Sequence, residues 1–581
     1  MQVEVKRAGK TVPHSLGRVM RTLPCWLAII AYAIEIAVVA FLFILSIVFT
    51  PIFLRVGDGY GPTHLSENQN NHFGTPSAMF VVGFLMLFLF FLMSSVILAR
   101  VRGHWMLPVL LIYAFLVQVL WIASLSMISY MYPDSVSLSN AAVALLQGDD
   151  DCRQYAVGVD ACMSEEAFSQ SQQYFSWYPF QAGPLMWYMI IFHIFGSRNV
   201  IAFQVVNACF ITVFIAVLWR FGTHIGLRNE GRAAFASLSA TCMPLMMFAA
   251  FVYPNAIGLT VVMSGLLLAA EAFSMKHAWS SVLALVSAFV LCGVGMVFKT
   301  TFQILVIAGV IASLFAIWKS RRYWQLPVVL AAVFVAKRIL DWPTQWLERV
   351  TGLDFGKGMP MSAWIAIGLG QPKNMPAGWW SPEMLQMFMR VDGDYSKQSE
   401  IAMGTVRQRL TDMLNNPASG RQFFVHKLAS EWAEPTFMTS LYSELGESSI
   451  NQNTGISSEV LHGSLTIPLL RYQNVSQSLI YFLALIGIAV LIRKIHREKT
   501  QSMDPAEIFS SVLLSTSFIG GFLCYVFWEA KGIYTLPFYL MLLPFAALGL
   551  QQSSNMLSGL SRRILKKSAL DKLRNRIFVK D

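Results

Sequence analysis

Residues 78–99 read AMFVVGFLMLFLFFLMSSVILA, a stretch of 22 positions that contains no charged side chain. An α-helix rises about 1.5 Å per residue, so a helix of this length crosses the hydrocarbon core of a bilayer, which is roughly 30 Å thick. Similar runs recur along the 581 residues, of which 55% are hydrophobic and 13% are charged. Together with a mean hydropathy of +0.54, they predict an all-α polytopic membrane protein.

The apolar runs predict about twelve transmembrane helices. They are expected at residues 26–50, 78–99, 105–131, 200–219, 233–252, 256–275, 280–298, 301–318, 325–340, 476–493, 507–528 and 535–551. The first run is longer than the apolar region of a signal peptide, and no small-residue cleavage site follows it closely. We therefore expect the first helix to stay as a membrane anchor.

Basic residues gather in the short segments and tails beside the apolar runs. The formal net charge is +11 and the isoelectric point is about 9.3. Because Lys and Arg are enriched in cytoplasmic loops, membrane topology explains this charge without a nucleic-acid partner. Both termini are predicted to be cytoplasmic in a plasma membrane, with the large polar segments 51–77, 132–199 and 341–475 on the external face.

The chain is predicted to divide into five parts. They are an amino-terminal two-helix hairpin (1–100), a transmembrane core with an external loop at 132–199 (101–340), an external region (341–475), carboxy-terminal transmembrane helices (476–552) and a basic cytoplasmic tail (553–581). The external region is too long for a plain connector and contains many aromatic residues, which favours a folded, functional segment.

Asp134 is the first candidate for a chemical role. It follows the apolar run 105–131 directly and opens the polar loop. A carboxylate at the point where a helix leaves the bilayer can act as a base between a water-soluble acceptor and a lipid-borne reactant. Asp is also favoured at helix starts, so capping of the following helix is the structural alternative. Asp58, in a polar stretch after the first apolar run, is the rival for the same role.

The order of motifs around Asp134 resembles the core of the GT-C superfamily. These are integral-membrane glycosyltransferases that use polyprenyl-phosphate sugars, and they include protein O-mannosyltransferases and bacterial lipid-modifying members. The motifs are Asp134-Ser135, Ala144-Leu145-Leu146-Gln147-Gly148, Tyr178-Pro179 and Phe195-Gly196. The resemblance implies a GT-C-like core with large external loops.

A second motif near the carboxy terminus extends the resemblance. Glu529-Ala530-Lys531-Gly532-Ile533-Tyr534, followed by Pro537, is similar to the Glu-x-x-x-Arg-Tyr element that many bacterial members carry before their last helix. Ile533 stands at the Arg position of that element. Lys531 is therefore the candidate that would supply the positive charge.

The resemblance implies an inverting transfer in which an acceptor hydroxyl attacks C1 of the sugar and polyprenyl phosphate leaves. Asp134 is then the expected base, and Lys531, Tyr534 and Glu529 are the expected groups around the leaving phosphate. The expected partners are a polyprenyl-phosphate sugar donor, membrane lipid and a cell-envelope glycan, lipid or protein acceptor. No phosphate-binding loop for a soluble nucleotide is present in the sequence.

Three further residues are candidates for substrate binding. Lys299 lies between two apolar runs, where it could bind a lipid phosphate or extend to the headgroups. Tyr178 and Gln181 lie at the end of the polar loop. Sugars stack on aromatic rings, although Tyr178 could equally belong to an interfacial aromatic belt. Glu529 and Lys531 could likewise form a solvated pair at the membrane surface.

Two other classes of protein remain open from the sequence. A transporter or flippase for lipid-linked sugars also has about a dozen spans and intramembrane charges. An envelope-assembly scaffold would make the candidate residues dispensable.

No spacing resembles a zinc site, while the run Asp149–Asp151 leaves a bound divalent cation open. Cys152 and Cys162 lie in the predicted external loop, and the sequence leaves a disulfide between them open.

Overall fold

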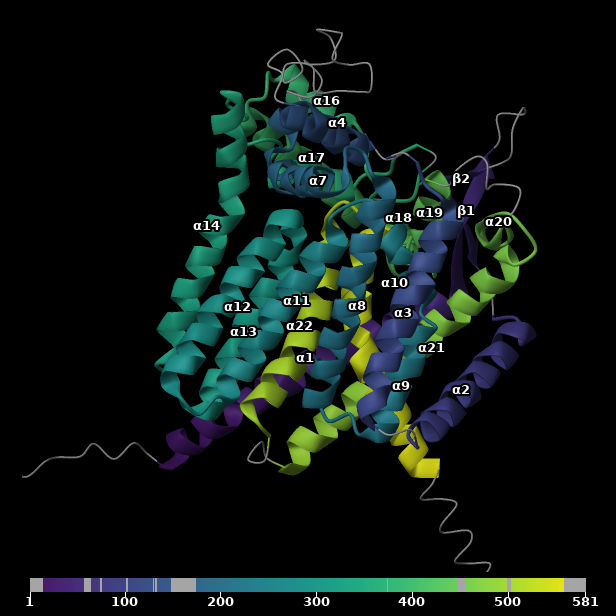
Figure 1. The fold of residues 1–581 in the computed structure, drawn as a ribbon, viewed down its shortest axis with the longest axis vertical. Helices are drawn as coiled ribbons and strands as arrows, with labels where there is room; N and C mark the ends of the chain where they lie inside the picture. The colour runs from purple at the N-terminus through teal and green to yellow at the C-terminus, as the bar shows by residue number, and fades with distance from the viewer. Residues whose placement is uncertain are drawn as a thin grey trace, which may run out of the picture.

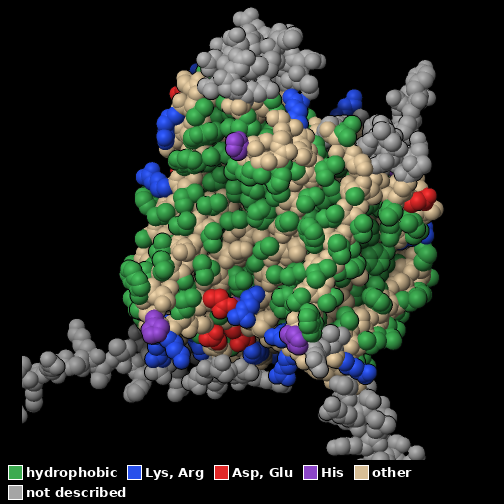
Figure 2. All heavy atoms as spheres, in the orientation of Figure 1, with side chains coloured by type: hydrophobic (Ala, Val, Ile, Leu, Met, Phe, Trp, Pro, Cys, Tyr) green, Lys and Arg blue, Asp and Glu red, His purple; other side chains and the backbone are tan. Residues whose placement is uncertain are grey.

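The computed structural model describes residues 14–56, 64–73, 76–100, 103–128, 130, 133–147, 174–373, 375–446, 455–498 and 503–557. Long helices stand side by side in a bundle, and shorter helices cover one end of it (Figure 1). On the face shown in Figure 2, a broad apolar belt crosses the bundle, and charged side chains lie toward its two ends. This distribution is the one expected for a multi-pass membrane protein, because lipid tails cannot solvate charge.

Ten helices in the described part of the chain are long and apolar enough to cross a membrane. Their apolar stretches are Trp26–Val48, Ala78–Leu98, His104–Leu125, Val200–His224, Asn255–Ser274, Ala278–Phe298, Thr300–Ser320, Thr466–His496, Pro505–Phe527 and Gly532–Leu557. The corresponding elements begin with α1 (His14–Val48), α2 (Ala78–Leu98), α3 (Gly103–Leu125), α8 (Val200–His224), α11 (Asn255–Ser274) and α12 (Ala278–Phe298). They continue with η4 (Thr300–Phe302), α13 (Gln303–Ser320), α21 (Thr466–Glu498), α22 (Pro505–Phe527), α23 (Gly532–Tyr539) and η5 (Leu540–Leu542).

The expected count of about twelve spans is not confirmed, and two of the expected helices explain the difference. The run 233–252 forms α9 (Asn229–Ala240), α10 (Met243–Met247) and η3 (Phe248–Ala250), with a bend of 58° between Asn229–Ala240 and Met243–Ala250. Pro244 lies at the start of α10, and proline lacks the N–H that would continue a helix. Counted as one bent span, this pair raises the number to eleven among the described residues.

The run 325–340 is the second of these two helices. It belongs to the longer helix α14 (Gln325–Thr351), which carries Lys337, Arg338 and Asp341. Three charges within one stretch make it less apolar than the other long helices. Its apolar part packs against α12, where a Cβ on Gly293 would lie 2.9 Å from Ala336 Cα. Close backbone approach at small residues is typical of helix packing in membranes.

The cap consists of short helices from two separate parts of the chain (Figure 1). The first part contributes α4 (Pro133–Gln147), η2 (Pro179–Gln181) and α7 (Ala182–Phe195). The second contributes α15 (Met361–Gly368), α16 (Glu383–Arg390), α17 (Tyr395–Asn415), α18 (Pro417–Trp432), α19 (Thr439–Gly446) and α20 (Ile456–Leu461). Trp379 and Trp432 are fully buried, and their rings pack against Phe53 of the amino-terminal part and against Phe518 and Phe522 of α22, so the region after α14 is packed onto the rest of the protein.

Two antiparallel strands accompany the helices at the same end. The strands β1 (Phe49–Val56) and β2 (His64–Phe73) pair with Phe53 opposite Gln69, and the register shifts between Phe53 and Arg55. Because β1 begins where α1 ends, the hairpin extends the first membrane helix toward the cap. The proposed division of the chain into five parts stays a prediction.

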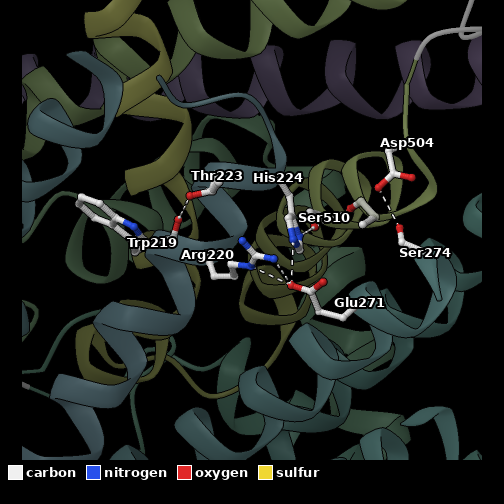
Figure 3. A network of polar contacts seen from close by, with 9 residues as sticks. Trp219, Arg220, Thr223, His224, Glu271, Ser274, Asp504 and Ser510 are labelled. Carbon is white, nitrogen blue, oxygen red and sulfur yellow. Dashed lines mark hydrogen bonds and ion pairs between the residues drawn. The ribbon is translucent and has the colours of Figure 1, made fainter. Parts of the chain in front are cut away.

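The opposite end of the bundle is cross-linked by polar side chains of α8, α11 and the start of α22 (Figure 3). Glu271 Oε1 lies 2.7 Å from Arg220 Nη2 and 3.2 Å from His224 Nε2. His224 Nδ1 lies 3.0 Å from Ser510 Oγ, and Ser274 Oγ donates to Asp504 Oδ2 over 2.8 Å. We call these residues the opposite-end network.

Candidate active site

Asp134 lies in the first turn of α4, where the positive end of the helix dipole favours a carboxylate. Its Oδ1 accepts a hydrogen bond from Tyr174 Oη over 2.9 Å. Burial raises the pKa of Tyr174 well above its ordinary value, and the charge of Asp134 adds to this effect. Tyr174 therefore stays protonated and orients the carboxylate. The dipole interaction means that stabilisation of α4 also remains a role for Asp134.

Tyr178 directly precedes the short helix η2, and Gln181 is the last residue of η2, directly before α7. Burial raises the pKa of Tyr178, and the charges of Asp134 and Glu529 raise it further. Gln181 Oε1 accepts a hydrogen bond from Tyr253 Oη, and the Gln181 side chain is buried. Gln181 thus holds Tyr253 in place, and its expected contact with substrate stays a prediction.

Lys299 lies in the extended link between α12 and η4. Its Nζ lies 4.6 Å from the ring centroid of Tyr534 and 5.3 Å from that of Tyr253, within the range of cation–π attraction. Burial lowers the pKa of Lys299, whereas the charges of Asp134 and Glu529 oppose that shift. The amine therefore points to aromatic rings of the protein and is close enough to two carboxylates to be influenced by them.

Glu529 and Lys531 lie in the short link between α22 and α23. The exposed fractions of the Glu529 residue and the Lys531 side chain are 6% and 14%, and Lys531 Nζ lies 2.9 Å from Glu67 Oε1. The alternative of a solvated Glu529–Lys531 pair is therefore wrong, because both residues are shielded and the ion-pair partner of Lys531 is Glu67. Lys531 Nζ also lies 5.7 Å from the ring centroid of Trp379.

The surroundings of these two residues change their protonation. Burial raises the pKa of Glu529 to about 7, although Lys531 and Lys299 act in the opposite direction. Burial tends to lower the pKa of Lys531, but Tyr442, Glu67 and Glu529 together raise it above its ordinary value. Lys531 is consequently a permanent cation near neutral pH, whereas Glu529 is a carboxyl group that exchanges its proton there.

A buried lysine fixes the backbone next to Glu529. Lys427 Nζ donates to Gly368 O over 2.6 Å and to Trp528 O over 2.7 Å. The N–H of Ala530 donates to Gly378 O over 2.9 Å. Gly378 has a φ of +76°, and a Cβ there would lie 2.7 Å from the Lys427 side chain, so glycine alone fits this crossing. These contacts hold the link 528–531 on both sides of Glu529.

Aromatic side chains form a wall beside the charged groups. The rings of Trp364 and Trp528 are nearly parallel, with 8° between their planes and 6.3 Å between their centroids. The Tyr178 ring lies 5.8 Å from that of Trp364. Flat aromatic surfaces of this kind suit the apolar faces of sugar rings.

A cavity of about 370 Å³ lies next to this wall. Its lining comes from η2, α7, the end of α12, the start of η4, α14 and the segment that follows α14, namely Pro179, Phe180, Gly183, Val297, Thr300, Leu340, Asp341, Pro343, Thr344, Gln345, Gly356 and Lys357. This volume falls within the range of small-molecule sites. Its hydroxyl, amide and charged groups make it suitable for a polar ligand.

The structure therefore brings Asp134, Tyr178, Lys299, Glu529, Lys531 and Tyr534 to one end of the bundle, although they come from four distant parts of the chain. Their roles in binding or catalysis stay predictions. Asp58, the acidic run Asp149–Asp151 and the pair Cys152 and Cys162 lie outside the described residues. Within the ranges that are described, no group of three or more His, Cys, Asp or Glu side chains is arranged to hold a metal ion.

The sequence alone did not point to Glu67, Tyr174 or Tyr253 as site residues, whereas Lys427 lies in the stretch 426–435, which could hold an acceptor or pin the long external segment. Tyr253 offered a signal, because the turn 253–255 links the expected helices 233–252 and 256–275 on the predicted external face. Glu67 lies in the segment 51–77, which is predicted on the same face as Asp134, but no local pattern pairs it with Lys531, which follows 464 positions later. Lys427 precedes Glu431 by four positions, a spacing typical of an exposed helical ion pair rather than a buried one.

The chain was also compared with known proteins. No family model matches it, and no curated protein matches it. Among solved structures, it is similar to the crystal structure of ArnT from Cupriavidus metallidurans bound to undecaprenyl phosphate. The two share 17% sequence identity over 77% of this chain and 78% of that chain, with a TM-score of 0.32.

Proposed function

We propose that this protein is an inverting GT-C-type glycosyltransferase that moves a sugar from a polyprenyl-phosphate donor to a cell-envelope glycan, lipid or protein. The observation that carries the proposal is the convergence of two lysines, Lys299 and Lys531, with the carboxyl groups of Asp134 and Glu529 at one end of a membrane bundle. Cations suit a phosphate headgroup, and a partly exposed carboxylate suits a base. The resemblance of the motifs to the GT-C superfamily supports the same conclusion.

The reaction assigns one role to each group. The acceptor oxygen forms a bond to C1 of the sugar while the bond between C1 and the phosphate oxygen breaks. The acceptor proton passes to Asp134, which Tyr174 orients, and the bonding electron pair stays on the polyprenyl phosphate. Lys299 and Lys531 stabilise the charge that grows on that phosphate. Glu529, whose pKa is raised to about 7, supplies a hydrogen-bonding group beside Lys531.

The position of the site supports a reaction at the membrane surface. Lys299, Glu529 and Lys531 all lie in links between apolar helices, at the covered end of the bundle. A polyprenyl chain can therefore stay in the lipid while its phosphate reaches the lysines. We assign this end to the external face of a plasma membrane, because the basic residues of the sequence gather beside the other ends of the spans.

The decisive experiment measures sugar transfer in membranes that contain equal amounts of each variant and a panel of polyprenyl-phosphate sugars. Asp134→Asn should lower transfer by about 10²- to 10⁴-fold, because amide nitrogen cannot accept the acceptor proton. Asp354→Asn is the matched control, since Asp354 is an exposed carboxylate that follows α14 and contacts only its own turn in the described contacts.

Three outcomes separate the hypotheses. Loss of transfer in Asp134→Asn alone supports the proposal. Loss in Asp58→Asn with normal transfer in Asp134→Asn would move the base to the rival residue. The proposed enzyme activity would be contradicted if all variants transferred sugar equally well. It would also be contradicted if the wild type transferred no sugar from any donor in the presence of acceptors.

One observation favours the second candidate, a transporter for lipid-linked sugars. Glu35 is fully buried within the membrane span of α1, and buried intramembrane carboxylates are common in transport pathways. Glu35→Gln keeps the shape of the side chain and removes its charge. We expect it to leave sugar transfer within about twofold of the wild type. A transporter would instead lose movement of lipid-linked sugar in vesicles with Glu35→Gln and keep it with Asp134→Asn.

A further inference from the structure

The ion pair between Lys531 and Glu67 joins the candidate site to the amino-terminal hairpin. Lys531 Nζ and Glu67 Oε1 are 2.9 Å apart, and Glu67 is the more exposed partner, with 29% of its side chain accessible against 14% for Lys531. Glu67 belongs to β2, which precedes the rest of the site in sequence by a wide margin. The hairpin is therefore more than a membrane anchor, because it supplies a charged group to the site.

Several contacts hold Glu67 in this position. Leu65, two residues earlier in β2, donates its N–H to Glu444 Oε1 over 2.9 Å. The paired strand β1 packs Phe53 against Trp379, with 6.4 Å between their ring centroids. Trp379 is also the ring that faces Lys531 Nζ. The hairpin is thus anchored to α19 and to the loop before α16, and Glu67 extends from it toward Lys531.

The charges at the site explain what Glu67 changes. Lys299 and Lys531 are the two basic groups near the carboxyl groups of Asp134 and Glu529. Lys531 Nζ already lies 2.9 Å from Glu67 Oε1, so the ammonium group that would bind an anion is paired with a carboxylate of the protein. Removal of the Glu67 charge would leave Lys531 more available to an anion.

We propose that Glu67 is an internal competitor for the phosphate of the donor: it pairs with Lys531 in the empty site and gives up that contact when a polyprenyl phosphate binds. This inference rests on the proposed function, because it assumes that Lys531 binds the phosphate. No covalent bond changes in the exchange. A carboxylate and a phosphate oxygen alternate as the acceptor of the Lys531 ammonium protons.

The exchange has a consequence for turnover. A lysine without a competing carboxylate would bind both the donor and the polyprenyl-phosphate product more tightly. Tight product binding slows release, which limits many enzymes. Glu67 would return to Lys531 as the product leaves, so that the protein keeps a usable lysine without being blocked by its own product.

The test uses the full-length protein in lipid nanodiscs, with farnesyl phosphate as the probe and farnesol as the control for the chain alone. Glu67→Gln should bind farnesyl phosphate about tenfold more tightly than the wild type, as expected for removal of a coupled competitor. Farnesol affinity should not change. Glu383→Gln is the matched control, since Glu383 forms an ion pair of similar length with Arg409, 2.8 Å apart, on the surface of the cap.

A second variant separates competition from loss of folding. In Lys531→Met, which has no cation for Glu67, the additional change Glu67→Gln should have no effect on affinity for farnesyl phosphate. Unfolding temperatures of all variants identify any that fail to fold. Equal or weaker binding by folded Glu67→Gln would overturn the inference and make Glu67 a residue that positions Lys531.

The same measurement distinguishes this failure from failure of the proposed function. If the wild type binds farnesyl phosphate and Glu67→Gln binds it no more tightly, only the competition is wrong. If no variant binds farnesyl phosphate, the phosphate site itself is wrong, and the inference falls with it.

Discussion

The two ends of the bundle both contain clusters of charged residues, but they hold them in different ways. In the opposite-end network, Arg220, His224 and Glu271 extend from the ends of long helices and contact one another directly, with half of the Arg220 side chain accessible. At the site end, Lys299, Glu529 and Lys531 lie on short links between helices, and the two lysines face aromatic rings. The first arrangement joins helices, whereas the second is the one that we propose for binding a ligand.

This difference has a physical cause. Direct ion pairs between exposed side chains are screened by water and contribute up to about 1 kcal/mol each. Charges held beside rings and backbone links are poorly solvated, so they interact strongly with whatever anion or cation reaches them. We therefore expect substitutions at the site end to change binding and transfer, and matched substitutions at the opposite end to change stability slightly.

The largest difference in sugar transfer between the two ends of the bundle is expected when one cation is removed from each end. Lys299→Met should lower sugar transfer by about 10²- to 10³-fold, because the phosphate loses one of its two stabilising amines. Arg220→Met should leave transfer within about twofold and lower stability by less than about 1 kcal/mol. Transfer assays and thermal unfolding of both variants in the same lipid provide the measurement.

The opposite ranking would break the comparison. If Arg220→Met reduced transfer as much as Lys299→Met did, the opposite-end network would have to take part in function. If Lys299→Met changed only stability, Lys299 would be a structural residue that pairs with the rings of Tyr253 and Tyr534.

The sequence predicted the charged groups of the site better than the contacts among them. Lys299, Glu529 and Asp134 follow apolar runs, so hydropathy and the distribution of Lys and Arg predict them at one end of the spans. The polar loop after Asp134 and the region after α14 were also expected at that end, and the described parts of both lie in the cap. These predictions depend on local patterns, which a sequence contains directly.

The missed contacts depend on pairing between distant segments. Glu67 reaches Lys531 because two strands pair and pack on Trp379, and no local pattern specifies that partner. Lys427 is fully buried and donates to the carbonyls of Gly368 and Trp528, which lie 59 and 101 positions away in the sequence, so no local pattern specifies these partners either. The bend at Pro244 was missed because the surrounding residues are apolar enough for a continuous span.

The next largest effect concerns the lysine that fixes the site end. Lys427→Met should destabilise the protein by about 3–5 kcal/mol, because it leaves two carbonyls unsatisfied and removes the cation 4.0 Å from buried Glu431. Transfer should fall as well, since Trp528 and Glu529 lose their fixed backbone. Thermal unfolding and transfer at a temperature below both transitions measure the two effects separately.

Lys397→Met is the control for this prediction. Lys397 pairs with Asp394 over 3.3 Å, but 70% of its side chain is accessible. Its loss should leave the unfolding temperature close to that of the wild type, because water screens an exposed ion pair. Similar unfolding temperatures for the two variants would mean that burial of Lys427 contributes nothing to the fold, and the contrast between fixed and exposed charges would fail.

The smallest effect, and the one that sharpens the comparison most, is the pH dependence of phosphate binding. Burial raises the pKa of Glu529 to about 7, so this carboxyl group is mostly neutral at pH 6 and mostly ionised at pH 8. Ionisation adds a negative charge beside Lys531 and Lys299, which disfavours an anion. Wild-type affinity for farnesyl phosphate should therefore fall several-fold, relative to Glu529→Gln, as the pH rises from 6 to 8.

Comparison with Glu529→Gln is essential because the phosphate ligand itself gains charge near pH 6. That gain affects both proteins equally, so only the ratio of their affinities reports on Glu529. At pH 6 the ratio should be close to one, because a protonated carboxyl group and an amide are both neutral. Glu271→Gln, in the opposite-end network, should keep the wild-type profile. If the ratio of the two affinities stayed constant from pH 6 to 8, Glu529 would not titrate beside the phosphate. Glu529 would then not belong to the phosphate site that we propose for the two lysines.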